Sequence, residues 1–187
     1  MEEFNKYDGF VTNWIFNDET APYYNGENFT KYNIEDGLIT LLPEDDAAVV
    51  HMGNEWRMPS PGEMIELFQN TDLYYISLDG NVVAGPHVFA ESISDTALDG
   101  SKLRSLCLIK SGEVFDYNNR TNFIEFPFAG EIVDFLLQYK NIGGLMWTNS
   151  RTTRVEDAIH LSFVSNGTFN KGNLWRNIGR PIRGVCA

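Results

Sequence analysis

Apolar and polar positions follow two different periods along the chain, and the period changes near residue 72. Before that point, Met64, Leu67 and Phe68 lie at i, i+3 and i+4, the spacing of one buried helix side. After it, apolar residues form short runs or alternate with polar ones, as along Ala158–Val164, which is typical of strands. The pattern predicts two helices followed by an irregular antiparallel sheet with long loops, an α+β protein.

The first helix is predicted over Pro43–Met52. It opens with a proline and the three carboxylates Glu44–Asp46 and closes at Gly53, which matches the polarity of a helix dipole. Acidic residues are common in first helical turns, so we interpret the triplet as structural rather than as a cation site.

The second helix is predicted from Ser60 to about Asn70. Ser60 is a good N-cap residue, Pro61 suits the first helical position, and Glu63 is placed to reach back to the cap. These residues predict a capping box at this helix start.

Segments after residue 72 have the length and composition of strands. The predicted strands are Leu73–Leu78, Val82–Phe89, Leu103–Ile109, Phe123–Phe128, Leu145–Thr148, Ala158–Val164 and Pro181–Val185. The polar stretches Arg151–Asp157 and Asn166–Asn177 are predicted loops, and the Asn- and Tyr-rich start of the chain predicts short strands and long loops.

Length and composition fit one domain over residues 1–187. Apolar residues make up 43% and aromatic residues 13% of the chain, which argues against disorder. The formal charge of −12 repels phosphate backbones, so we expect no nucleic acid partner. The sequence has no apolar run long enough to span a bilayer and no signal-peptide pattern, so we expect no membrane insertion by this chain itself, and any signal or lipid anchor would belong to a longer precursor.

Two cysteines leave two interpretations open. Cys107 and Cys186 could close one disulfide, or Cys107, which lies in an apolar run, could be a buried free thiol. Neither cysteine belongs to a CxxC motif or to a Cys/His cluster with zinc spacing.

No motif in the sequence indicates catalysis. His51, His87 and His160 share no spacing that implies a site, and P-loop, GxGxxG, GxSxG and HExxH motifs are absent. The Glu-Pro-Asn, Gln-Pro-Asp and Trp-Asn-Asp motifs of calcium-dependent lectins are also absent. Trp147–Asn149 is only weakly similar to the last of these motifs. We therefore expect a protein that is not an enzyme and that has no cofactor and no metal site.

The order of the motifs resembles the FISUMP-type major paralogous domain of bacterial surface proteins. The resemblance runs from about Tyr7 to the end, and the segments that carry it are Leu42–Ala48, Gly53–Ser60 with Glu63 and Leu67, Phe123–Gly130, Gly143–Ser150, and Ala158–Phe163 with Arg176, Gly179, Pro181, Arg183 and Val185. It implies a C-type-lectin-like fold. The first strand of the family is either replaced by Phe10–Phe16 or missing from this chain, and His51–Met52 and Leu145–Met146 depart from the usual residues, as in a diverged member.

The resemblance implies a non-enzymatic, extracellular or cell-surface binding or adhesion module whose ligand is a glycan or a protein. An alternative is a phage-borne or retroelement-diversified receptor-binding domain of the same fold. A further alternative is a relative of the formylglycine-generating oxidases, which requires Cys107 and Cys186 to meet in a solvent-accessible cleft.

The retroelement variable proteins bind ligands through the segment before their final strand, which corresponds here to residues 147–177. This resemblance and the loop composition select Trp147, Asn149, Arg151, Arg154, Asn166, Asn170, Asn173 and Trp175 as candidate ligand-binding residues. Asn-Gly turns and solvated loops give the same composition without a ligand, and for Trp147 a place in the core is the favoured interpretation. Arg57, Arg176 and Arg183 are expected to be structural.

Overall fold

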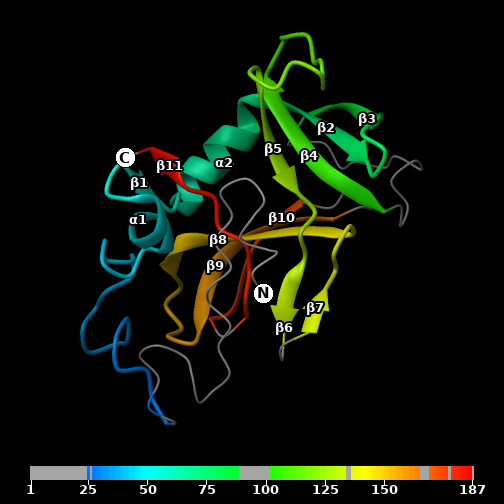
Figure 1. The fold of residues 1–187 in the computed structure, drawn as a ribbon. Coiled ribbons are helices and arrows are strands. Elements are labelled where there is room, and N and C mark those ends of the chain that lie inside the picture. The colour runs from blue at the N-terminus through cyan, green and yellow to red at the C-terminus, as the bar shows by residue number, and fades with distance from the viewer. Residues whose placement is uncertain are drawn as a thin grey trace.

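The structure is a computed structural model in which residues 25, 27–88, 102–133, 136–164, 169–176 and 178–186 are described. Within these ranges the elements, in chain order, are α1 (Ala47–Met52), β1 (Trp56–Arg57), α2 (Pro61–Gln69), β2 (Thr71–Ser77), β3 (Val82–Val88), β4 (Leu103–Lys110), β5 (Phe123–Pro127), β6 (Glu131–Val133), β7 (Leu136–Gln138), β8 (Gly143–Arg151), β9 (Asp157–Val164), β10 (Phe169–Trp175) and β11 (Val185–Cys186) (Figure 1). The predicted α+β composition with two short helices is present.

The strands of the described ranges pair in antiparallel sheets. The largest has the order β3-β2-β4-β5, the second has the order β10-β9-β8, and the pairs β1-β11 and β6-β7 form small ribbons. The single irregular sheet expected from the sequence is therefore divided into separate sheets.

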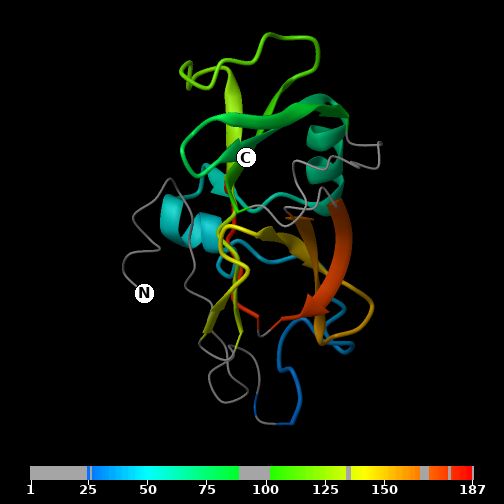
Figure 2. The same ribbon diagram turned by 90° about the vertical axis from the view of Figure 1, so that its right-hand side faces the viewer.

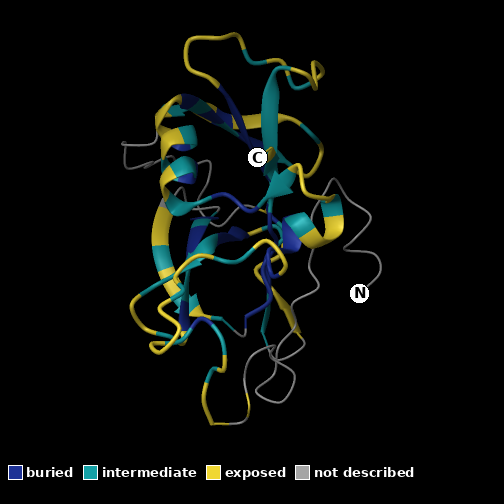
Figure 3. Cartoon of the chain, turned by 90° about the vertical axis from the view of Figure 1, so that its left-hand side faces the viewer, coloured by how far each residue is buried: buried dark blue, intermediate teal, exposed yellow. Residues whose placement is uncertain are grey.

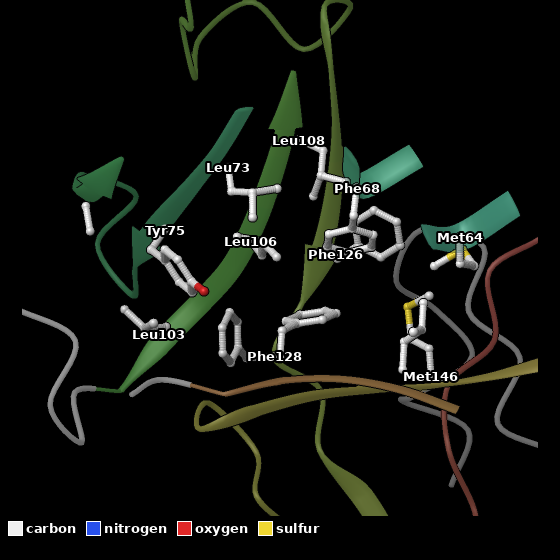
Figure 4. Packing of buried hydrophobic residues seen from close by; sticks show 13 residues of the cluster. Met64, Phe68, Leu73, Tyr75, Leu103, Leu106, Leu108, Phe126, Phe128 and Met146 are labelled. Atoms are coloured by element: carbon white, nitrogen blue, oxygen red, sulfur yellow. The ribbon is translucent and has the colours of Figure 1, made fainter. Parts of the chain in front are cut away.

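The main core fills the space between the four-stranded sheet, α2 and one face of the β10-β9-β8 sheet (Figure 4). Phe68 of α2, Phe126 of β5 and Phe163 of β9 meet at its centre, with ring centroids 5.7–6.2 Å apart. Met146 of β8 closes the lower side of this cluster.

A second core lies on the other face of the same three-stranded sheet. Trp147 and Ala158 pack there with Ala47 and Ala48 of α1, and with Ile182 near the C-terminus. Strands β8 and β9 are thus covered on both faces, and many exposed residues lie in the connections (Figure 3).

The first helix begins later than predicted. Asp46 is its N-cap and accepts hydrogen bonds from the Ala48 and Val49 backbone, so the helix starts at Ala47 rather than at Pro43. The same carboxylate accepts the Met58 backbone N–H at 2.8 Å. Asp46 therefore caps α1 and also holds the segment that leads into α2.

The second helix agrees with the prediction. Ser60 is its N-cap, Pro61 begins it, and Ser60 and Glu63 form the reciprocal capping box. Helix α2 ends at Gln69 with Asn70 as the C-cap.

The predicted strands are found with small differences at their ends, except the last. Of Pro181–Val185 only Val185 is in a strand, and Phe89 lies outside the described residues. Strand β10 lies in the polar stretch Asn166–Asn177, whose composition predicts a loop, and β1, β6 and β7 have no counterpart among the predicted strands. Strand β10 is an edge strand of its sheet (Figure 2), and its apolar residues do not alternate with polar ones, so hydrophobic alternation does not mark it.

Candidate functional site

Trp147 lies in the second core. Its side chain is 8% exposed, and its Nε1 donates a hydrogen bond to the Ile178 carbonyl at 2.9 Å. The Arg180 guanidinium lies 4.9 Å from the ring centroid. The Trp147 ring is packed and its N–H is used inside the protein, which agrees with the favoured interpretation of Trp147 as a core residue and removes it from the candidate ligand-binding residues.

Arg151 holds two distant parts of the backbone together. Its Nε donates to the Leu38 carbonyl at 2.6 Å, its Nη2 to the Asn33 carbonyl at 2.8 Å, and its Nη1 to the Thr152 carbonyl at 2.7 Å. All three guanidinium nitrogens bind backbone oxygens. Arg151 is therefore a structural clamp on the chain before α1 rather than a residue poised for a ligand, which corrects a second site prediction.

The arginines expected to be structural do make internal contacts. Arg176 donates to the Tyr32 carbonyl at 3.2 Å. Arg183 donates to the Glu125 carbonyl at 2.8 Å, and Arg57 pairs with Glu63.

The remaining candidates have different positions. Asn149 is partly buried, and its backbone N–H donates to the Pro59 carbonyl while its carbonyl accepts the Leu41 N–H. Asn170 is exposed on β10, and Asn166 lies outside the described residues.

Three of the predicted residues do come together, around the carboxylate of Asp157. Asn173 donates from Nδ2 to Asp157 Oδ2 at 2.8 Å, and Arg154 Nε lies 3.6 Å from the same oxygen. Trp175 pairs with Asp157 in the β9–β10 register and projects on the same sheet face as Asn173. We call Arg154, Asp157, Asn173 and Trp175 the Trp175 surface.

Asp157 is the buried residue that holds this surface together. It is 3% exposed, whereas Trp175 is 60% exposed and the Arg154 side chain is 68% exposed. A buried carboxylate thus fixes an exposed amide and draws an exposed guanidinium beside a large exposed ring. Such an arrangement offers an apolar platform with hydrogen-bond donors at its rim, which suits recognition by contact.

Sequence reasoning missed Asp157 because it was placed at the end of a predicted loop. A signal was present, since Asp157 continues the period-two series of Ile159 and Leu161 by one more step. The sequence could therefore have indicated that Asp157 points to the same face of the strand as Ile159 and Leu161. It could not have indicated that Asn173 is the hydrogen-bond partner of Asp157.

The two cysteines lie in different environments. Cys107 has no exposed surface and Cys186 is exposed, and both are free thiols. Burial raises the pKa of the Cys107 thiol to about 12. The predicted alternative of a buried free thiol is present at Cys107, and the shared solvent-accessible cleft that the oxidase alternative requires is not formed.

Among the described residues, no group of three or more His, Cys, Asp and Glu residues could hold a metal ion. No helix found there is long and apolar enough to cross a membrane.

No known family model matches the chain, and no curated protein or solved structure is detectably similar to it. The resemblance to the FISUMP-type domain therefore rests on the sequence motifs alone.

Proposed function

We propose that this protein is a non-enzymatic binding module that recognises a glycan with the Trp175 surface. The observation that carries the proposal is the exposed Trp175 ring beside Asn173 and Arg154, both fixed to buried Asp157. A sugar ring can pack its C–H face on an indole while its hydroxyl groups bond to an amide and a guanidinium at the rim.

The surface is built on strands, which favours binding over chemistry. Asn173 and Trp175 stand on β10, and Asp157 begins β9, so their spacing is set by sheet register rather than by a loop. A rigid platform loses little conformational entropy when a ligand binds.

We further propose that the module has a C-type-lectin-like fold of the FISUMP type and acts at the cell surface or outside the cell. The motif resemblance supports this part of the proposal, and so does the arrangement of two short helices with antiparallel sheets.

A second candidate is a phage-borne or retroelement-diversified receptor-binding domain. The position of Trp175 and Asn173 just before the C-terminal segment favours it, because the variable proteins place their ligand face there. A nearby near-copy of the coding segment in the gene would select this candidate over the first.

The test is a glycan array with the purified chain, run with calcium and again with a chelator. We expect binding that survives chelation, that is lost in Trp175→Ala and that is weakened in Asn173→Ala. Leu136→Ala is the matched control, because Leu136 is an apolar side chain with similar exposure of 66% on β7. Binding that persists in Trp175→Ala, or that requires calcium, would contradict the proposal.

A further inference from the structure

A second polar cluster lies on the four-stranded sheet, on the face turned away from the main core. The connection from β4 to β5 is the loop at the top of Figure 1, and several of its residues contact this face. Asp72 accepts from Ser111 Oγ at 2.9 Å and from the Gly112 N–H at 3.0 Å, which fixes the start of the connection. Phe115 then stacks on Tyr74 with ring centroids 4.3 Å apart. The connection is thus attached to the sheet at two successive points.

Glu125 of β5 is the centre of the cluster. It accepts from Ser105 Oγ at 2.6 Å, from the Tyr117 hydroxyl at 2.9 Å and from Arg120 Nη1 at 2.5 Å. Arg104 Nε lies 3.5 Å from Glu125 Oε1, the same oxygen that accepts from Ser105 and Tyr117. These partners hold the pKa of the Glu125 carboxyl below its usual range despite burial, so Glu125 is ionised at neutral pH.

A β-bulge turns Arg104 toward this cluster. The β2–β4 register passes from Ile76↔Ser105 to Ser77↔Leu103 and leaves Arg104 without a partner on β2. In a bulge of this kind the extra residue is re-aimed, and here Arg104 points to the same side as Ser105 and Glu125.

Arg120 is held by an aromatic ring as well as by Glu125. Its guanidinium lies 4.3 Å from the Tyr117 ring centroid and 5.8 Å from that of Phe123. Tyr117 and Phe123 are themselves stacked, at 5.6 Å. The guanidinium is therefore fixed from two directions before any ligand arrives.

Both guanidiniums keep donors for a ligand. The Arg104 and Arg120 side chains are 49% and 51% exposed, and each contacts Glu125 through one nitrogen. A guanidinium has five N–H donors, so the contact with Glu125 leaves further donors on each arginine. Two guanidiniums on one carboxylate also leave one positive charge, on a chain whose formal charge is −12.

We propose that Arg104 and Arg120 bind the carboxylate of an acidic sugar residue. One excess positive charge matches one carboxylate, and fixed guanidiniums suit its planar, two-oxygen geometry. The net negative charge of the whole chain disfavours long polyanions at the same place. The partly exposed ring of Tyr117 lies beside the Arg120 guanidinium and the partly exposed ring of Phe115 lies next to Tyr117, and both offer apolar surface to the sugar. The acidic-sugar site deepens the proposed glycan function, but it uses none of the residues of the Trp175 surface.

The test is calorimetric titration of the full chain with methyl glucuronide and with methyl glucoside, which is the same ring without the carboxylate. We expect the glucuronide to bind at least about tenfold more tightly, and Arg120→Gln or Arg104→Gln to weaken it about tenfold, the usual size of one charge-assisted hydrogen bond. Arg120→Lys keeps the charge and is expected to fall between the wild type and Arg120→Gln. Thermal unfolding of each variant checks that the connection has kept its structure.

Lys140→Gln is the control, since it removes an exposed positive charge outside both surfaces and should leave glucuronide binding unchanged. Trp175→Ala on the glycan array tests the Trp175 surface, whereas Arg120→Gln with methyl glucuronide tests this site, so failure of one proposal and failure of the other give different results. Equal affinity for the two sugars, no binding of either, or no effect of Arg120→Gln would overturn the inference. Equal binding of an N-acetylated dipeptide with a free carboxyl end would overturn it as well, in favour of a protein carboxylate.

Discussion

Arg57 and Glu63 form a two-point ion pair across the start of α2. Arg57 Nη1 lies 2.8 Å from Glu63 Oε2, and Nη2 lies 2.5 Å from Oε1. Oε2 also accepts the Ser60 N–H at 2.8 Å, so one carboxylate closes the capping box and binds the arginine that precedes the helix. This ion pair therefore helps to set the direction of the chain as it enters α2, the structural role expected for Arg57.

We predict that Glu63→Gln lowers the free energy of unfolding at neutral pH by an amount that the wild type itself loses when Glu63 is protonated in acid. The hydrogen bonds of Arg57, together with those of Ser60, lower the pKa of Glu63 from 4.5 to about 2. A lowered folded-state pKa stabilises the protein fully above the unfolded value, and this contribution is lost as the pH falls from 4.5 toward about 2. The side chain is 42% exposed, so after solvent screening we expect only about 1 kcal/mol.

Urea unfolding of wild type and Glu63→Gln across this pH range measures the effect. The difference in unfolding free energy should be largest above pH 4.5 and shrink toward zero near pH 2. Glu66→Gln, the same exchange on the exposed side of α2, should show no such trend. A difference between wild type and Glu63→Gln that stays constant with pH would contradict the role given to this pair.

We predict that His160 makes stability fall in mild acid. Burial, and next the charge of Arg180, lower the pKa of His160 from 6.5 to about 4, and Arg180 is itself paired with buried Glu131. The unfolded chain binds a proton at higher pH than the folded one, so stability is complete above pH 6.5 and decreases down to about pH 4. The loss is on the order of 3 kcal/mol.

The slope of unfolding free energy against pH is the measurement. His160→Phe should flatten it between pH 4 and 6.5 whatever its effect on absolute stability, while His51→Asn, an exposed control, should keep it. An unchanged slope in His160→Phe would show that another group titrates there.

Local features of this fold were predictable, and distant ones were not. The capping box joins Ser60 and Glu63, three positions apart, so the sequence displays both partners. Arg151 instead binds carbonyls of Leu38 and Asn33, 113 and 118 positions away, and backbone carbonyls leave no mark in a sequence. Its structural role could therefore not be separated from a binding role.

The same distinction applies to the candidate site. Trp147 lies in an apolar run and Trp175 in a polar one, so their opposite exposures follow the sequence pattern. The link between Asp157 and Asn173 depends on the β9–β10 register, and β10 itself has too little alternation to be recognised.

We predict that only Cys186 reacts with a thiol reagent in the native protein. Cys186 is exposed and free, whereas Cys107 is buried with its pKa raised to about 12, so at neutral pH it is neither accessible nor a thiolate. Iodoacetamide labelling followed by mass spectrometry should find one modified cysteine in native protein and two after unfolding. Cys186→Ser should abolish native labelling, and fast labelling of Cys107 would restore the case for an oxidase.

The contact between Gly144 and Phe163 gives the sharpest test of how the three-stranded sheet meets the main core. Gly144 of β8 pairs with Phe163 of β9, and a Cβ at Gly144 would lie 1.8 Å from Phe163 Cε2. Phe163 is fully buried and cannot move aside without disturbing its neighbours Phe68 and Phe126. Gly144→Ala should therefore cost at least about 2 kcal/mol of unfolding free energy.

The adjacent Gly143 is the matched control, because the nearest atom to its Cβ would be 3.4 Å away and belongs to the Tyr139 side chain. Gly143→Ala should change stability much less, although both glycines are buried in the same strand. The double variant Gly144→Ala/Phe163→Leu should lose less unfolding free energy than the two single variants together, because the smaller leucine side chain makes room for the methyl group of the alanine. Equal effects of Gly143→Ala and Gly144→Ala in urea unfolding would mean that Phe163 does not pack over β8 as described.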